Sequence, residues 1–245
     1  MSDLVLDKNY KKGDKGKKIR LCQEWLCLHG FHIAIDGEFG PATDYAVRRF
    51  QEKNKMTING IIDKHTFDAL VKPMTTALNN IPEYKKSLSQ MIAEYAEQHV
   101  EQNPREVGGK NCGPWVRFYM KGNEGQQWFW NAGFVSFILK QACQSLNAPL
   151  PITPSYSCDI LAWSAKENNI LRKSSQFQDK SRIPPGSFFL QRRISNDWRH
   201  TGIIIRAADD YFITIEANTN DEGPPEGHMV CHRIRGYNKK DLIIF

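Results

Sequence analysis

The sequence predicts an α+β protein with two parts, a small unit of three helices and a larger domain that combines helices with an antiparallel sheet. Residues 13–72 carry apolar side chains at helical spacing, and the segment that follows the turn-rich stretch near residue 80 is helical again. After residue 185 the chain changes to short β-branched and aromatic runs separated by turns. Helices first and antiparallel strands after them are typical of an α+β domain.

We expect a helical domain over residues 10–73, a linker over residues 74–81 and a second domain over residues 82–245. In the first domain, "KKIRLCQEWLCLHGF" has helical periodicity and ends at Gly30, which suits a helix C-terminus. Two turn-plus-helix units follow, "DGEFGPAT" and "NGIIDKHT". Because each begins with an Asp-Gly or Asn-Gly turn, the pattern indicates a repeated local design.

The second domain is expected to begin with a helix that has Pro82 in its first turn. A buried helix follows in "WFWNAGFVSFIL", and Ser157 caps another. The runs "SFFLQRR", "HTGIIIRA", "YFITIEANT", "MVCHRIR" and "DLIIF" predict strands, and "AADD" predicts a hairpin turn between the second and the third of them.

Composition limits the classes of function. The net charge of +6 suits an anionic polymer, but no nucleic-acid-binding motif occurs, so we expect no nucleic-acid partner. No apolar run reaches the length of about 20 residues that a membrane span needs, so we expect no membrane insertion. The sequence starts without a secretory signal, which predicts synthesis in the cytoplasm and, for any role outside, export by a signal-independent route. No zinc-binding spacing is present, and no metal site or cofactor is expected.

Residues 128–139 combine aromatic side chains with the start of an apolar helix, and Asn131 stands where that helix should begin. A cysteine at such a place would be a thiolate nucleophile, because the helix dipole lowers the pKa of the thiol. His200 opens a later strand, and Glu216 and Asn218 lie two residues apart on the next one. Residues two apart on a strand share a face, so either side chain is expected to orient the imidazole.

The first domain resembles the type 1 peptidoglycan-binding domain, a three-helix module attached to bacterial wall hydrolases. The resemblance covers about 60 residues, and the matching positions are Gly30, Asp36, Gly37, Phe39, Gly40, Thr43, Ala46, Val47, Phe50, Gln51, Gly60 and Thr66. It implies a wall-binding role, with Asp36 and Phe39 as candidate contacts to peptidoglycan.

Most of residues 108–245 resemble the CHAP family, the cysteine- and histidine-dependent amidohydrolases and peptidases with a papain-like α+β fold. The resemblance places the family's base at His200 and its orienting groups at Glu216 and Asn218. The nucleophile position falls on Asn131, and an amide is not a nucleophile at neutral pH. Trp128 and Trp130 are candidates to line a sugar–peptide groove, with a role as core anchors as the alternative.

Three explanations of Asn131 remain open at this stage. The nucleophile of an otherwise intact enzyme has been replaced, another cysteine such as Cys158 or Cys112 serves, or the domain is a binder in which asparagine only caps a helix. We favour the first, because His200, Glu216 and Asn218 are all retained.

The two resemblances together imply a peptidoglycan amidohydrolase that cuts either the muramoyl–alanine bond or a peptide bond in the stem or cross-link. We expect it to act on the wall of a target cell as an exported antibacterial effector, which predicts a dedicated immunity protein. The alternatives are a phage endolysin and a non-catalytic peptidoglycan-binding protein.

Overall fold

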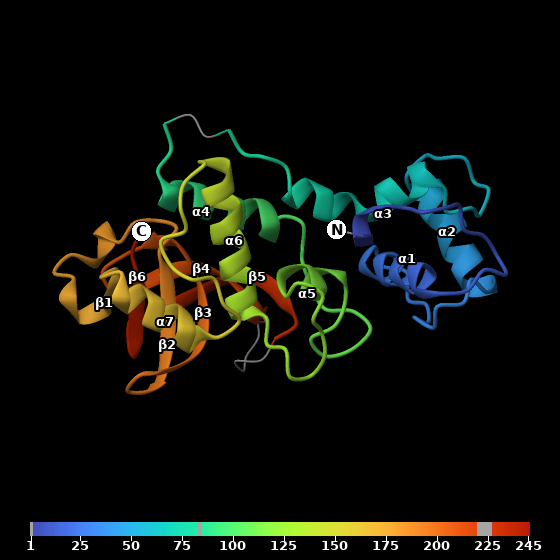
Figure 1. The fold of residues 1–245 in the computed structure, drawn as a ribbon. Coiled ribbons are helices and arrows are strands. Elements are labelled where there is room, and N and C mark those ends of the chain that lie inside the picture. Colours follow the sequence, from blue (N-terminus) through green and yellow to red (C-terminus); the bar gives the residue numbers. More distant parts are fainter. Residues whose placement is uncertain (1, 83–84, 220–226) are drawn as a thin grey trace.

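The computed structural model describes residues 2–82, 85–219 and 227–245, which form two lobes side by side (Figure 1). One lobe holds the first three helices, and the other combines the remaining helices with a sheet. The α+β class predicted from the sequence is confirmed. Within the described ranges, no helix has both the length and the apolar character that a membrane crossing would require.

The N-terminal lobe contains α1 (Lys17–Leu28), α2 (Pro41–Lys53) and α3 (Lys64–Ala77). The predicted repeat has the same hydrogen bonds in both units. Gln23 donates to the Thr43 hydroxyl (3.0 Å) and accepts the N–H of Gly37 (2.8 Å). Gln51 likewise donates to the Thr66 hydroxyl (3.2 Å) and accepts from the glycine N–H of its own turn (3.0 Å). Each buried glutamine thus fastens an Asx-Gly turn to the helix that follows it.

The C-terminal lobe contains α4 (Leu88–Val100), α5 (Pro114–Tyr119), α6 (Asn131–Ser145) and α7 (Cys158–Glu167). Its strands are β1 (Leu171–Lys173), β2 (Phe188–Ile194), β3 (Asp197–Ala207), β4 (Tyr211–Thr219), β5 (Met229–Gly236) and β6 (Lys240–Ile243). They pair antiparallel in the order β1-β6-β2-β3-β4-β5. The Ala208 N–H donates to the Tyr211 carbonyl (2.8 Å), which closes the predicted hairpin turn.

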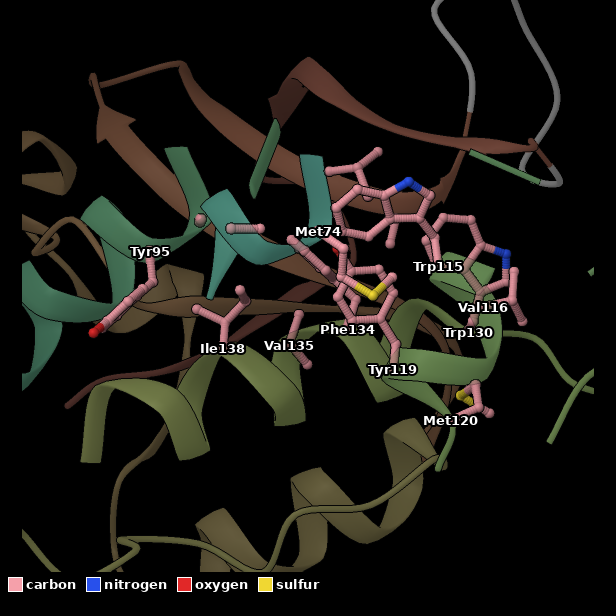
Figure 2. Close-up of a cluster of buried hydrophobic side chains, with 14 of the residues drawn as sticks. Met74, Tyr95, Trp115, Val116, Tyr119, Met120, Trp130, Phe134, Val135 and Ile138 are labelled. Atoms are coloured by element: carbon pink, nitrogen blue, oxygen red, sulfur yellow. The ribbon is translucent and has the colours of Figure 1, made fainter. Parts of the chain in front are cut away.

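Two expected boundaries are wrong. The segment 74–81 is not all linker, because α3 continues to Ala77 and Met74 is buried beside the aromatic residues of the second lobe (Figure 2). Helix α4 begins at Leu88 rather than near Pro82. Ser87 caps it, through a reciprocal capping box with Gln90 (2.9 and 3.3 Å), which sets the helix start. Residues 83–84, which the expected helix included, lie outside the described residues.

The sheet has two buried faces. Phe188 belongs to the large core shared with the helices, whereas its neighbour Phe189 belongs to a smaller cluster with Ile204, Phe212 and Leu242. Because successive residues of a strand point to opposite faces, these two clusters lie on opposite sides of the sheet. Helices α4, α6 and α7 pack on the side of the large core.

The two lobes are joined by a polar and an aromatic contact. Arg117 of α5 donates to Glu24 of α1 (2.5 Å), and the Glu24 side chain is only 2% exposed. The rings of Trp25 and Trp115 meet edge to face with centroids 6.0 Å apart. The three N-terminal helices are therefore held against the second domain rather than tethered by a free linker.

A buried histidine makes the stability of the C-terminal lobe depend on pH. His99 is fully buried, with Nδ1 2.9 Å from the Tyr119 hydroxyl and Nε2 2.9 Å from Oε1 of Gln141. Burial lowers the pKa of His99 from 6.5 to about 4. Since the folded-state pKa lies below the unfolded value, this contribution to stability is complete above pH 6.5 and is lost as the pH falls towards 4.

We expect the free energy of unfolding to fall by about 3 kcal/mol between pH 7 and pH 4 through this residue. Urea unfolding at several pH values measures it. A His99→Gln variant should lose most of the slope between pH 6.5 and pH 4, and an unchanged slope in that variant would show that other groups cause it.

Candidate active site

His200 and Glu216 form a buried pair on adjacent strands of the sheet. His200 Nε2 lies 2.7 Å from Oε2 of Glu216, and the two residues are 6% and 0% exposed. A bulge at Arg199 shifts the pairing of β2 with β3 directly before His200, which therefore lies where the regular pairing of these strands ends. With Nε2 bonded to the carboxylate, Nδ1 is the ring nitrogen left to act on another group.

Two further side chains hold the carboxylate of Glu216. Arg235 of β5 donates to both of its oxygens, Nε to Oε1 (2.8 Å) and Nη2 to Oε2 (2.6 Å), and Thr214 donates to Oε1 (2.6 Å). Burial raises the pKa of Glu216, but the hydrogen bonds from Arg235 and His200 outweigh it and lower this pKa to about 2. Glu216 is therefore ionised at neutral pH, and Nε2 of His200 carries the proton that faces it.

The space around the pair explains Gly202. A Cβ atom there would lie 2.6 Å from Cγ of Glu216 and 2.8 Å from Cε1 of Phe189. The ring of His200 also lies against Phe189, with centroids 5.9 Å apart. The His200–Glu216 pair is therefore on the sheet face of the smaller cluster, opposite the face that α6 covers.

Asn131 is the first residue of α6 and is 7% exposed. Its Oδ1 accepts a hydrogen bond from the thiol of Cys158 (3.3 Å), the first residue of α7. The alternative that Asn131 merely caps the helix is wrong, because the capping position belongs to Trp130 and the Asn131 side chain bonds Cys158. The Asn131 carboxamide thus fills a defined polar position between two helix starts.

Cys158 is a poor substitute nucleophile. Burial raises the pKa of its thiol to about 12, so the group is protonated at neutral pH and serves as a hydrogen-bond donor. Burial also raises the pKa of Cys112, the other cysteine considered. Both pKa shifts oppose activation of a second cysteine.

Two chains of contacts place the start of α6 at the end of the sheet where His200 lies. Asp159, next to Cys158, accepts the backbone N–H of Trp198 (2.7 Å), two residues before His200. Among the described residues, no direct hydrogen bond joins Asn131 to His200. The structure therefore brings both to one end of the sheet without pairing them.

The second chain of contacts runs through Glu106, which sequence reasoning missed. Its Oε1 accepts from Nε1 of Trp130 (2.9 Å) and from Nδ2 of Asn218 (3.3 Å), and its Oε2 accepts the N–H of Asn111 (2.8 Å). Glu106 thus fastens the residue before Asn131 to the end of β4. An acidic residue beside the glycines of "REVGGKN" was the available signal.

Asn218 does not hold the imidazole as the sequence suggested. It has a positive φ of 55°, and a bulge lies between Glu216 and Thr219. Its Nδ2 donates to Oδ1 of Asn111 (3.0 Å) and to the Gly227 carbonyl (2.8 Å). The alternation of a regular strand fails at this bulge, and among the described residues Glu216 is the side chain that bonds His200.

The predicted aromatic contacts divide into core and surface. Trp130 is fully buried and stacks on Tyr119, with centroids 5.8 Å apart and planes at 5° (Figure 2). It is therefore a core anchor and cannot line a substrate groove. Trp128 is half-buried and meets Tyr156 edge to face at 6.2 Å, so it remains a candidate contact.

In the helical lobe, Phe39 is 2% exposed and belongs to the core, so its expected contact with peptidoglycan is wrong. Asp36 is exposed, but Oδ1 accepts from Gln23 Nε2 and from the Glu38 N–H, both at 2.8 Å. Asp36 thus shapes the first turn while its side chain stays exposed.

Comparison with known protein families identifies the helical lobe. Residues 15–70 match the family described as "Putative peptidoglycan binding domain", and this part of the chain is such a domain. Among curated proteins, none matches the chain.

Three solved structures are each similar to a part of the chain. A fused Zn-dependent amidase/peptidase/peptidoglycan-binding domain-containing protein from Clostridium acetobutylicum ATCC 824 is 35% identical over 31% of this chain and 30% of its own, with a TM-score of 0.26. A peptidoglycan-binding protein from Clostridioides difficile is 40% identical over 26% and 40%, with a TM-score of 0.26. The SleB N-terminal domain is 32% identical over 28% and 94%, with a TM-score of 0.27. The chain thus spans less than half the length of the first two.

Proposed function

We propose that the protein is a peptidoglycan amidohydrolase of the Cys-His type whose nucleophile position is occupied by Asn131. The observation that carries the proposal is the buried His200–Glu216 pair at 2.7 Å, at the same end of the sheet as the start of α6, in a chain that has a peptidoglycan-binding domain. A buried histidine held by an ionised carboxylate is the arrangement that a general base needs.

In the active form, a cysteine at position 131 would attack an amide carbonyl of the wall. His200 would take the thiol proton at Nδ1 and later give it to the leaving amine, while Glu216 stabilises the imidazolium that forms in between. The backbone N–H at the start of α6 supplies a donor for the oxyanion, helped by the helix dipole. Water then releases the acyl group and regenerates the thiol.

The binding domain would raise the local concentration of the second domain on its polymeric substrate. Because Arg117 and Glu24 hold the two lobes together, the wall contact and the cut would be made at a fixed mutual orientation. Candidate contacts that remain accessible are Asp36 in the first lobe and Trp128 in the second.

The test is a paired digestion of purified peptidoglycan by the chain as it stands and by Asn131→Cys, with products identified by mass spectrometry. We expect fragments from Asn131→Cys alone, with masses that identify the scissile amide, and none from Asn131→Cys/His200→Ala. Fragments from the chain as it stands as well as from Asn131→Cys would show that another residue is the nucleophile.

A non-catalytic wall-binding protein is the second candidate, favoured by the fit of Asn131 to Cys158 (3.3 Å). It predicts that every variant above binds the wall and none releases fragments. Co-sedimentation with insoluble peptidoglycan in the same experiment separates loss of binding from absence of cutting.

Delivery is part of the proposal. We favour an exported antibacterial effector that acts on the wall of a target cell, with a dedicated immunity protein covering the start of α6 and His200. A phage endolysin would share the chemistry without that partner. Neighbouring holin genes would indicate the endolysin, and neighbouring secretion and immunity genes the effector.

A further inference from the structure

A groove of about 1070 Å³ runs along one side of α6 and is distinct from the His200–Glu216 pair. Its residues on that helix include Gly133, Phe137, Lys140 and Gln144, spaced three or four apart and therefore on one helical face. From Gly133 to the last helical residue the groove is about 18 Å long. Its volume lies slightly above the range of about 300–1,000 Å³ that is usual for small-molecule sites.

The walls of the groove come from several elements and are mainly apolar or aromatic. Phe118 of α5 and Phe137 of α6 are only partly buried, and their rings lie 4.8 Å apart at an interplanar angle of 57°. The other apolar or aromatic residues of the lining are Leu4, Val5, Leu78, Tyr119, Pro154 and Tyr156. Apolar and aromatic side chains that gather from several elements at a surface groove indicate a surface that a ligand covers.

The charge at the groove has one sign. Among the described residues that line it, the charged side chains are Lys121 and Lys140. Both also border a neighbouring hollow of about 840 Å³, so they stand at the rim between the two. Burial, and then the charge of Lys121, lower the pKa of Lys140. An anion placed between these lysines would favour their charged forms, and so would oppose the lowering of the Lys140 pKa by burial and by Lys121.

We propose that this groove binds a long-chain anion, with its hydrocarbon chain against Phe118 and Phe137 and its carboxylate or phosphate head group between Lys121 and Lys140. The apolar part of the lining, which includes Leu4, Phe118 and Phe137, suits a hydrocarbon chain better than a peptide backbone, whose polar groups need partners. A methylene chain has no polar groups to satisfy. This binding is independent of the proposed hydrolase activity.

The test is isothermal titration of the full chain with tetradecanoate and with tetradecyl phosphate, both below their micellar concentrations. Tetradecanol is the uncharged probe and acetate the chainless one. We expect saturable binding of both long-chain anions, no binding of acetate, and binding of tetradecanol weaker by about tenfold or more.

The variant Lys121→Gln/Lys140→Gln should weaken both anions by about tenfold or more and leave tetradecanol unchanged. Lys166→Gln on exposed α7 is the matched control and should bind as the parent chain does. Circular dichroism spectra identical to those of the parent would show that the double variant is folded. Three results would each overturn the proposal. They are failure of both long-chain anions to bind, equal affinity for tetradecanoate and tetradecanol, and undiminished anion binding by the double variant. Preference for phosphate over carboxylate, or the reverse, would identify the head group.

Discussion

The variant Glu216→Gln is expected to lose about 3 kcal/mol of the free energy of unfolding at pH 7, since breaking a buried ion pair leaves the remaining charge without compensation. Glu216 is fully buried, and Arg235 donates to both of its oxygens. A glutamine of nearly the same shape would keep the packing, but would leave that guanidinium with only a neutral partner. Urea denaturation followed by tryptophan fluorescence measures the loss.

The Glu216 carboxylate also predicts that the protein loses stability in acid. Its pKa of about 2 in the folded protein lies below the ordinary 4.5. This stability is therefore present above pH 4.5 and is lost as the pH falls towards 2, and the Glu216→Gln variant should lack this part of the pH dependence. Glu167→Gln on exposed α7 is the control. If Glu216→Gln matches that control in both stability and pH dependence, the carboxylate is not the centre of the polar cluster.

The variant Arg117→Met is expected to cost about 3 kcal/mol as well, and to loosen the contact between the lobes. Arg117 contacts Glu24 at 2.5 Å, Glu124 at 2.8 Å and Asp3 at 3.4 Å, so one guanidinium balances three carboxylates. Without it, the charged partner that the described residues leave to the nearly buried Glu24 is Arg20 at 3.5 Å. Urea denaturation measures the stability, and limited proteolysis reports whether residues near the α3–α4 connection become more accessible.

A double-mutant cycle with Glu24→Gln isolates the pair from other effects of the substitution. The double variant should be more stable than the sum of the two single losses predicts, because no buried charge is left unpaired. Additive losses, with proteolysis unchanged, would mean that the ion pair does not hold the lobes together.

The sequence predicted the fold class, the three N-terminal helices and strands β2 to β6, because these follow from periodicity and turn chemistry. It did not predict the three-residue strand β1. The predicted end of α3 was too early. The helix continues to Ala77, and Met74 and Ala77 are buried against residues that are distant in the sequence. Such tertiary packing leaves no local signal. The start of α4, in contrast, was readable from the capping pair Ser87 and Gln90.

The candidate site was predicted in part. The hydrogen bond between His200 and Glu216 follows from two neighbouring strands and was expected. The role of Asn218 was not, because a single residue with positive φ breaks the strand alternation on which the expectation depended. Arg235 and Glu106 come from a distant strand and a loop, so their contacts depend on sheet order and loop path rather than on sequence spacing.

The central claim is that His200 acts as a base towards position 131, and thiol reactivity tests it without requiring the natural substrate. Asn131→Cys and Asn131→Cys/His200→Ala would be alkylated with iodoacetamide from pH 5 to pH 10, and the rate at position 131 followed by peptide mass spectrometry. We predict a thiol pKa below about 7.5 in the first protein and a rise to about 8.5 or higher without His200. The same pH profile in both proteins would contradict the claim.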